Sequence, residues 1–202
     1  MRKLVSFLLL VLLLTMLTVG CSSGVSPDKV TKDFFDAMIK GDFETAAKLT
    51  GGADIKKDVL KTPKDEQGER LAKSILARIK YEIGDTKIEG NRAEVSVKVT
   101  APDLLRITSK AMSELLPMTF AMALSEDQSQ EKSDALFQQY FENAINDPNA
   151  PMTTSNIKVK LEKKDGSWIV KPDNELLNAL TGNMAKAFGE LDKKQRTQKS
   201  QK

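Results

Sequence analysis

The N-terminal segment constrains this chain more than any other, because it predicts that the protein is exported. Arg2 and Lys3 give a positive start, residues 4–19 are mainly apolar, and the small Gly20 precedes Cys21. These marks are typical of a secretory signal peptide, and the apolar run is shorter than the roughly 20 residues that span a bilayer as a helix. Because Cys21 is the only cysteine, the exported domain has no intramolecular disulfide and must rely on an apolar core.

The junction between Gly20 and Cys21 resembles the lipobox of bacterial lipoproteins, in which the signal peptide is cleaved directly before a lipidated cysteine. The sequence departs from the usual box because Thr18 stands where leucine is commonest, with Leu17 one position earlier. The resemblance implies that Cys21 carries acyl chains such as palmitate. Residues 21–26 would then tether the protein to the outer, extracytoplasmic face of the cell membrane, where two or more acyl chains hold a protein stably.

Composition argues against several classes of function. The formal net charge is +3, and Arg2 and Lys3 of the signal peptide account for two of these charges. A nearly neutral domain argues against nucleic-acid binding. The chain has no histidine, which removes the Ser-His-Asp and Cys-His catalytic arrangements and the commonest metal ligand. We therefore expect no metal, no cofactor and no catalytic residue.

Helical periodicity dominates the start of the domain. Ser26, followed by proline, is typical of a helix N-terminus, and the apolar face that follows predicts a helix over residues 27–40. A second helix is expected over residues 42–50 and a third over residues 71–79, where apolar residues recur at helical spacing. Residues 53–68 are polar and predict a loop.

The period of the pattern then changes from helical to alternating. Residues 81–88 indicate a strand that is interrupted at Gly84-Asp85. After a turn at Gly90-Asn91, residues 93–100 alternate apolar with polar side chains, which is typical of a strand with one buried and one solvated face.

A second pair of strands lies near the C-terminus. Residues 157–162 alternate in the same way, and Asp165-Gly166 predicts a two-residue hairpin that leads into residues 167–170. In such a hairpin, Trp168 lies on the same side as the apolar residues of the pair. Four antiparallel strands are therefore expected.

The segment between the two strand pairs predicts two helices. The first is expected to open at Thr100-Ala101-Pro102 and to kink at Pro117. Its methionines would form an adaptable apolar groove or fill the space between the helices, and the filling is the expected role. A last helix is predicted from Asp173, with an early end at Gly182-Asn183.

Two segments carry a resemblance to a family. Residues 27–50, with the turn Lys40-Gly41-Asp42-Phe43, resemble the opening helix pair of bacterial lipoproteins with a nuclear-transport-factor-two-like (cystatin-like) domain. Residues 157–182 look like the closing hairpin and helix of the same families. The resemblance implies a curved antiparallel sheet that wraps helices into a cone, which holds a small ligand or presents a surface to a partner. The helices between Pro102 and Asp147 depart from the simplest form of that fold.

We therefore predict an α+β fold in which a curved antiparallel sheet of about four strands packs on N-terminal helices, with an inserted helical hairpin. The expected organisation is a lipoprotein signal peptide at residues 1–20, a lipidated cysteine and tether at 21–26, one cone-like domain at 27–190 with the hairpin insertion at 102–147, and a basic disordered tail at 191–202.

The candidate residues for a pocket or core in the predicted cone are Phe34, Met38, Val97 and Trp168. Trp168 could stack on a ligand, although a tryptophan just after a tight turn is more often part of the core. Paired carboxylates could support acid–base chemistry, but their helical spacing on charged surfaces is more typical of a solvated face. The pairs are Asp33 with Asp36 and Asp54 with Asp58.

The expected function is that of a membrane-anchored extracytoplasmic lipoprotein with a non-enzymatic role, either binding a small apolar ligand or acting as an accessory module. One alternative is a protein-interaction module that binds an envelope protein through the helical hairpin. The other is a cyclase- or isomerase-like enzyme that uses carboxylates with Tyr81 or Tyr140. The expected partners are the membrane, through the lipid, and a second copy paired through exposed edge strands.

Overall fold

The computed structural model describes residues 24–52, 66–123 and 130–184. The signal peptide, Cys21, most of the predicted loop and the basic tail lie outside the described residues. The described helices are α2 (Pro27–Lys40), α3 (Phe43–Leu49), α5 (Glu66–Ala77), α6 (Leu104–Ala123), α7 (Gln130–Asn146) and α8 (Asn174–Leu180). The described strands are β1 (Lys80–Glu89), β2 (Arg92–Pro102), β3 (Met152–Lys164) and β4 (Ser167–Lys171).

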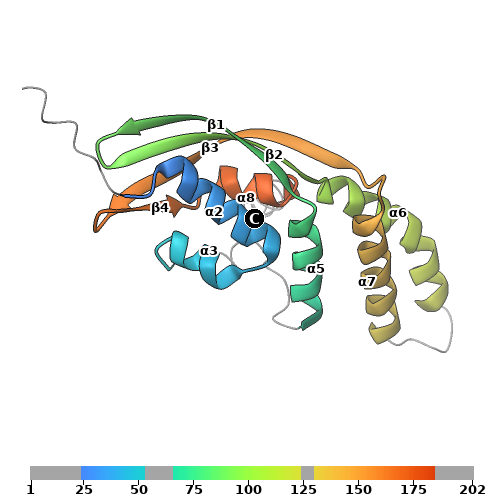
Figure 1. The fold of residues 1–202 in the computed structure, drawn as a ribbon. Coiled ribbons are helices and arrows are strands. Elements are labelled where there is room, and N and C mark those ends of the chain that lie inside the picture. The colour runs from blue at the N-terminus through green and yellow to red at the C-terminus, as the bar shows by residue number, and fades with distance from the viewer. Residues whose placement is uncertain (1–23, 53–65, 124–129, 185–202) are drawn as a thin grey trace, which may run out of the picture.

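The strands form one antiparallel sheet in the order β1-β2-β3-β4, which curves over the helices (Figure 1). Two-residue turns join β1 to β2 at Gly90-Asn91 and β3 to β4 at Asp165-Gly166. Leu161 pairs with Val170, as the predicted hairpin requires. The predicted α+β fold, with a four-stranded antiparallel sheet and helices on the N-terminal side, is confirmed.

The first strand differs from its prediction, because β1 is continuous through Gly84-Asp85. Ile83 pairs with Val97 and Thr86 pairs with Val95, so β1 carries one more residue than β2 over this step. The extra residue is accommodated as a β-bulge, which bends a strand without ending it. A Cβ atom on Gly84 would lie 3.3 Å from the Ser96 carbonyl oxygen, so glycine lets the two strands approach closely here.

The main core lies between the sheet and the helices that cover one of its faces. Figure 1 shows α2 and α8 beneath the strands, and alternate side chains of β2 point toward them, as the alternating pattern predicts. The largest side chains with less than 2 % exposure come from both layers: Phe34, Phe35, Met38, Leu76, Val95, Val99, Val159, Leu161, Leu176 and Leu180. Among the described residues, no helix covers the opposite face of the sheet.

The boundaries of three helices refine the predictions. Ser26 occupies the N-cap position of α2 without a side-chain capping hydrogen bond, and the buried Thr31 hydroxyl donates to the Pro27 carbonyl oxygen at 2.8 Å. The third predicted helix, α5, begins at Glu66, inside the predicted loop, and ends before Ile79. The last helix, α8, stops at Leu180, as the glycine after it predicts.

The helical hairpin, α6 and α7, stands at one end of the sheet (Figure 1). β2 continues through Pro102, so α6 begins at Leu104 and not at the predicted Thr100-Ala101-Pro102. Asp103 starts the helix, because its carboxylate accepts a hydrogen bond from the Arg106 backbone N–H at 3.0 Å. The contact between the helices buries a second apolar cluster, which consists of Leu104, Ile107, Ala111, Phe141 and Ile145.

The residues that follow α8 pack against the base of this hairpin. Gly182 is buried and adopts a left-handed conformation with φ of +54°, and Met184 packs against the α6–α7 cluster. A Cβ atom on Gly182 would overlap the Pro102 carbonyl oxygen and would lie 3.1 Å from the Leu104 nitrogen. The segment after α8 therefore packs against the junction between β2 and α6.

Candidate functional site

Three of the predicted pocket residues lie in the main core. Phe34 and Met38 from α2 are 0 % exposed, and Val97 from β2 is 2 % exposed. Trp168 from β4 is half-buried and packs against the same cluster, and the Lys163 ammonium group lies 5.7 Å from the centre of its ring. These four side chains occupy the space between the helices and the sheet, so their observed role is packing.

Tyr81 joins β1 to α2 and is one of the two tyrosines named for the enzyme alternative. Its hydroxyl donates to the Asp36 carboxylate at 2.5 Å, and its ring stacks on Phe35 with 4.9 Å between the ring centres. Burial, followed by this hydrogen bond, raises the pKa of Tyr81 to about 12. The Lys32 ammonium group, 2.6 Å from Asp36, gives the largest contribution to lowering the pKa of the Asp36 carboxyl.

Tyr140 makes the corresponding connection within the helical hairpin. Its hydroxyl donates to the Glu114 carboxylate at 2.6 Å, so it links α7 to α6. This hydrogen bond raises the pKa of Tyr140 to about 12. A tyrosine with such a pKa stays protonated at neutral pH, whereas a general base must already be deprotonated at the working pH. In the described structure both tyrosines connect neighbouring elements.

The acidic side chains of α2 lie on a solvated face. Asp33 pairs with Lys29 at 2.9 Å, and Asp36 pairs with Lys32. The predicted pair Asp54 and Asp58 lies outside the described residues. Within residues 24–52, 66–123 and 130–184, no three acidic, cysteine or histidine side chains gather as a metal site would require.

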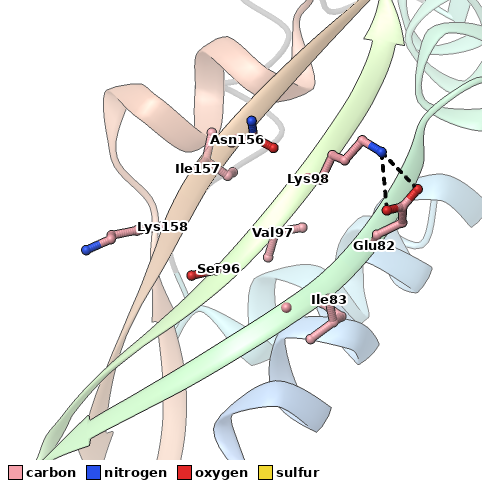
Figure 2. Close-up of a pocket in the computed structure, with 9 residues that line it drawn as sticks. Glu82, Ile83, Ser96, Val97, Lys98, Asn156, Ile157 and Lys158 are labelled. Atoms are coloured by element: carbon pink, nitrogen blue, oxygen red, sulfur yellow. Dashed lines mark hydrogen bonds and ion pairs between the residues drawn. The ribbon is translucent and has the colours of Figure 1, made fainter.

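An open hollow of about 390 Å³ lies on the uncovered face of the sheet, over β1, β2 and β3 (Figure 2). Gly84 and Ser96 are short residues that face each other across the β-bulge, which leaves space above them. At its edge Lys98 pairs with Glu82 at 3.3 Å. The residues that line the hollow are Glu82, Ile83, Gly84, Ser96, Val97, Lys98, Asn156, Ile157 and Lys158, and none of them is aromatic.

The cationic side chains at this hollow are already matched by acidic neighbours. Lys98 is paired with Glu82, and Lys158 is paired with Glu94 at 3.3 Å. Because exposed ion pairs of this kind are solvated on both sides, they leave little unbalanced charge to attract a ligand. The bulge in β1 and the small side chains on the open face explain the hollow without a ligand.

The most unusual surface lies on α6. Leu105, Met112, Leu116 and Phe120 are 45 %, 62 %, 67 % and 67 % exposed, and we call these four residues the hairpin surface. Their spacings of seven, four and four residues place them on one side of a helix. The buried seam with α7 uses other residues of α6, so this helix has a second apolar side that faces solvent.

Two further exposed apolar side chains lie beyond the hairpin surface, one on each helix. Met118 from α6 is 50 % exposed and Phe137 from α7 is 40 % exposed. The prediction that the methionines fill the space between the helices is wrong for Met112, which is 62 % exposed, and holds at most in part for Met118, which is half exposed. The sequence did contain a signal for this surface, since α6 has more apolar residues than one buried seam requires.

Comparisons with known proteins bear on the fold. No protein-family model matches the sequence, and no curated protein sequence matches it. The fold is similar to the crystal structure of YcdA, a candidate lipoprotein of Bacillus subtilis, with a TM-score of 0.52 and 14% sequence identity. The likeness covers 75% of this chain and 55% of that chain, so this chain spans about half the length of that protein. At this identity the likeness shows a shared fold only.

Proposed function

We propose that this protein is a lipid-anchored accessory module of the cell envelope that binds another envelope protein through its helical hairpin. The observation that carries the proposal is the hairpin surface. Large exposed apolar patches on a soluble domain mark interaction sites, because leaving them in water is unfavourable. Of the nine large apolar side chains exposed among the described residues, six lie on α6 or α7, so the exposure is concentrated on one part of the molecule.

The anchoring half of the proposal is supported by the N-terminal sequence. The signal-peptide pattern ends at Gly20 and Cys21, and α2 begins at Pro27, so a short stretch separates the lipid from the domain. The similarity of the fold to YcdA, itself a candidate lipoprotein, agrees with this assignment. In the part of the chain that the structure describes, no helix is long and apolar enough to cross a membrane.

The proposal that the protein is not an enzyme is supported by the hydrogen bonds of its two tyrosines. A cyclase or isomerase that used either tyrosine would need its hydroxyl free to face a substrate. Tyr81 and Tyr140 instead donate hydrogen bonds to Asp36 and Glu114, with the pKa of each tyrosine raised to about 12.

The anchor is tested with Cys21→Ala. We expect the wild-type chain to incorporate a labelled fatty acid and to sediment with membranes. The variant should incorporate no label and should lose the cleavage before residue 21. A Cys21→Ala chain that is still cleaved and still sediments with membranes would contradict lipid anchoring.

The interaction is tested with the double variant Leu116→Gln and Phe120→Gln, with Ile88→Gln as the matched control. Ile88 is 56 % exposed on β1, away from the hairpin. After gentle solubilisation of membranes, the wild-type chain and the control should migrate in a complex heavier than the chain itself, and the double variant should migrate alone. An unchanged complex in the double variant would show that the hairpin surface is not the binding site.

A further inference from the structure

We propose that β1 pairs antiparallel with β1 of a second copy of this chain, so that two sheets join edge to edge on the membrane. The inference does not involve the helical hairpin, and it rests on the proposed function only for the lipid anchor. Three features of β1 lead to it. They are a free edge, a row of charges that complements itself when the strand is reversed, and an exposed isoleucine near the end of the strand.

The outer edge of β1 has no partner strand among the described residues. Glu89 and Arg92 flank the two-residue turn, and a hydrogen bond between the flanking residues closes such a turn. Hydrogen-bonded and non-hydrogen-bonded pairs alternate along an antiparallel ladder. The residues of β1 whose N–H and C=O groups point outward are therefore Tyr81, Ile83, Thr86 and Ile88. An unpaired row of this kind is a template for another strand.

The charged side chains on either side of the bulge form one row on the open face of the sheet. Lys80 and Glu82 precede the bulge, and Lys87 and Glu89 follow it. The extra residue of the bulge keeps all four on the same face, because side chains otherwise alternate along a strand. Their partners on β2, none of which is buried, are Thr100, Lys98, Glu94 and Arg92. The row therefore reads positive, negative, positive, negative.

An antiparallel copy of β1 presents the same row in reverse, so opposite charges meet along the whole contact. Lys80 lies opposite Glu89 of the second copy, and Glu82 lies opposite Lys87. The two bulges then face each other at the symmetry axis. A shift by one position along the row would place Lys80 opposite Lys87, or Glu82 opposite Glu89. Because like charges directly opposite each other are destabilising, the charge pattern selects one register.

The same register brings the outward backbone groups and the apolar side chains together. Tyr81 lies opposite Ile88 of the second copy, and Ile83 lies opposite Thr86, so the residues with outward N–H and C=O groups pair with one another. Ile88 is 56 % exposed, whereas Tyr81 and Ile83 are half-buried and pack against the main core. In the pair, Ile88 of each copy lies opposite Tyr81 and diagonal to Ile83 of the other, within contact range of both.

The charged side chains of β1 have partners within the chain, and these pairs do not prevent the contact. Lys87 lies 2.7 Å from Glu89, and Lys98 lies 3.3 Å from Glu82. The side chains of Lys87 and Glu89 are 74 % and 69 % exposed, and exposed pairs of this kind contribute little to stability. Pairing with a second copy therefore adds opposite charges across the edge and buries no unpaired charge.

The edge contact is small, so the dimer requires a high local concentration. The ten residues of β1 extend about 33 Å, and with a sheet about 10 Å thick the contact covers roughly 330 Å² on each copy. A stable interface needs about 800 Å² from each partner. Anchoring both copies to one membrane raises their effective concentration. We therefore expect the dimer in the membrane and in concentrated protein, and its dissociation on the dilution of native electrophoresis.

The symmetry of the pair is compatible with anchoring of both copies to the same membrane. The symmetry axis passes through the joined sheet, so the covered faces of the two copies lie on the same side. Helix α2 lies on that face (Figure 1), and the tether leads into its N-terminus at Pro27. Both tethers therefore start from one side of the dimer.

The test is disulfide crosslinking in intact cells with the full-length, lipidated chain, whose only cysteine is Cys21. One variant carries Glu82→Cys with Lys87→Cys, and another carries Lys80→Cys with Glu89→Cys, so each keeps the other charge pair. In the proposed register the Cα atoms of each pair lie about 4.5 Å apart across the contact, which suits a disulfide. We expect both double variants to give a disulfide-linked dimer after mild oxidation.

The matched controls are the single variants Glu82→Cys and Lys87→Cys. In the proposed register the two copies of residue 82 lie about 13–16 Å apart along the strands, which is too far for a disulfide. Each single variant alone should therefore give no crosslinked dimer. Coexpression of the two single variants with different tags should give the mixed dimer only.

Each other result overturns the edge pairing. Absence of a crosslink in both double variants would show that the edge of β1 is free on the membrane. Equal crosslinking by single and double variants would show random collision or another register. Cys21→Ala and the double variant at Leu116 and Phe120 test the anchor and the hairpin surface separately, so failure of the proposed function is distinguishable from failure of this inference.

Discussion

Replacing Gly182 with alanine should destabilise the protein more than a left-handed glycine ordinarily would, because two penalties combine at this position. A non-glycine residue at positive φ costs about 1–2 kcal/mol, and Gly182 has φ of +54°. The added Cβ atom would also overlap the Pro102 carbonyl oxygen, and overpacking of a buried contact typically costs about 1–3 kcal/mol. We therefore expect Gly182→Ala to lower the free energy of unfolding by about 2–5 kcal/mol.

The matched control is Gly90→Ala in the turn between β1 and β2. Gly90 has φ of +61°, close to that of Gly182, but a Cβ atom added at Gly90 would have nothing within 4 Å. This variant should therefore lose the backbone contribution alone, about 1–2 kcal/mol. The difference between the two variants isolates the contact between the C-terminal chain and the base of the hairpin.

The assay is urea unfolding of the domain, followed by the fluorescence of Trp168, the only tryptophan. With a denaturant slope of ~2 kcal/mol per molar urea, Gly182→Ala should lower the midpoint by about 1–2.5 M and Gly90→Ala by about 0.5–1 M. Equal shifts in the urea midpoint for the two variants would refute the reasoning, because they would mean that the Pro102 carbonyl group moves aside for an added methyl group at no energetic cost.

Three further predictions test the site and the fold. The chain has two tyrosines, and the pKa of each is raised to about 12 in the folded protein. The stability that their hydrogen bonds contribute is therefore present below pH 10 and is lost as the pH rises through 12. Tyrosinate absorbance of the folded protein should stay low near pH 10, and a full transition there would contradict the hydrogen bonds of Tyr81 and Tyr140. Phe34→Ala should cost about 3–5 kcal/mol of stability, whereas Phe120→Ala, at an exposed position, should cost less than about 0.5 kcal/mol; similar losses in calorimetry would show that Phe120 is a core residue. Asp42→Ala, which removes the side chain that caps α3, should cost about 0.5–2 kcal/mol, and an unchanged unfolding midpoint would contradict that role.

The sheet and most helices could be predicted because their determinants are local. The alternation in β2 and the Asp165-Gly166 turn specify a strand and a hairpin within a few residues of sequence. The bulge at Gly84 could not be predicted as such, because a glycine inside a strand pattern is equally compatible with an interruption. The pairing of β1 with β2 on both sides of Gly84 settles which of these occurs.

The candidate site was less accessible to sequence reasoning, because exposure depends on which neighbours pack against a helix. The sequence pattern predicts that the methionines of α6 fill the space between the two helices of the hairpin. The structure assigns Ile107 and Ala111 to that interior and leaves Met112 and Phe120 in solvent. The contact of Gly182 with Pro102 likewise joins residues that are distant in sequence, so no local pattern could indicate it.

The measurement that tests the central claim most directly is hydrogen–deuterium exchange of the full-length protein in its native membranes, compared with the purified protein alone. If the hairpin is the docking element, exchange should slow in the native membrane over residues 104–123, while the strands around the hollow on the open face should exchange equally in both samples. Slower exchange at the strands 80–89 and 152–164, with no change over α6, would contradict the claim and move the functional surface to the open face of the sheet.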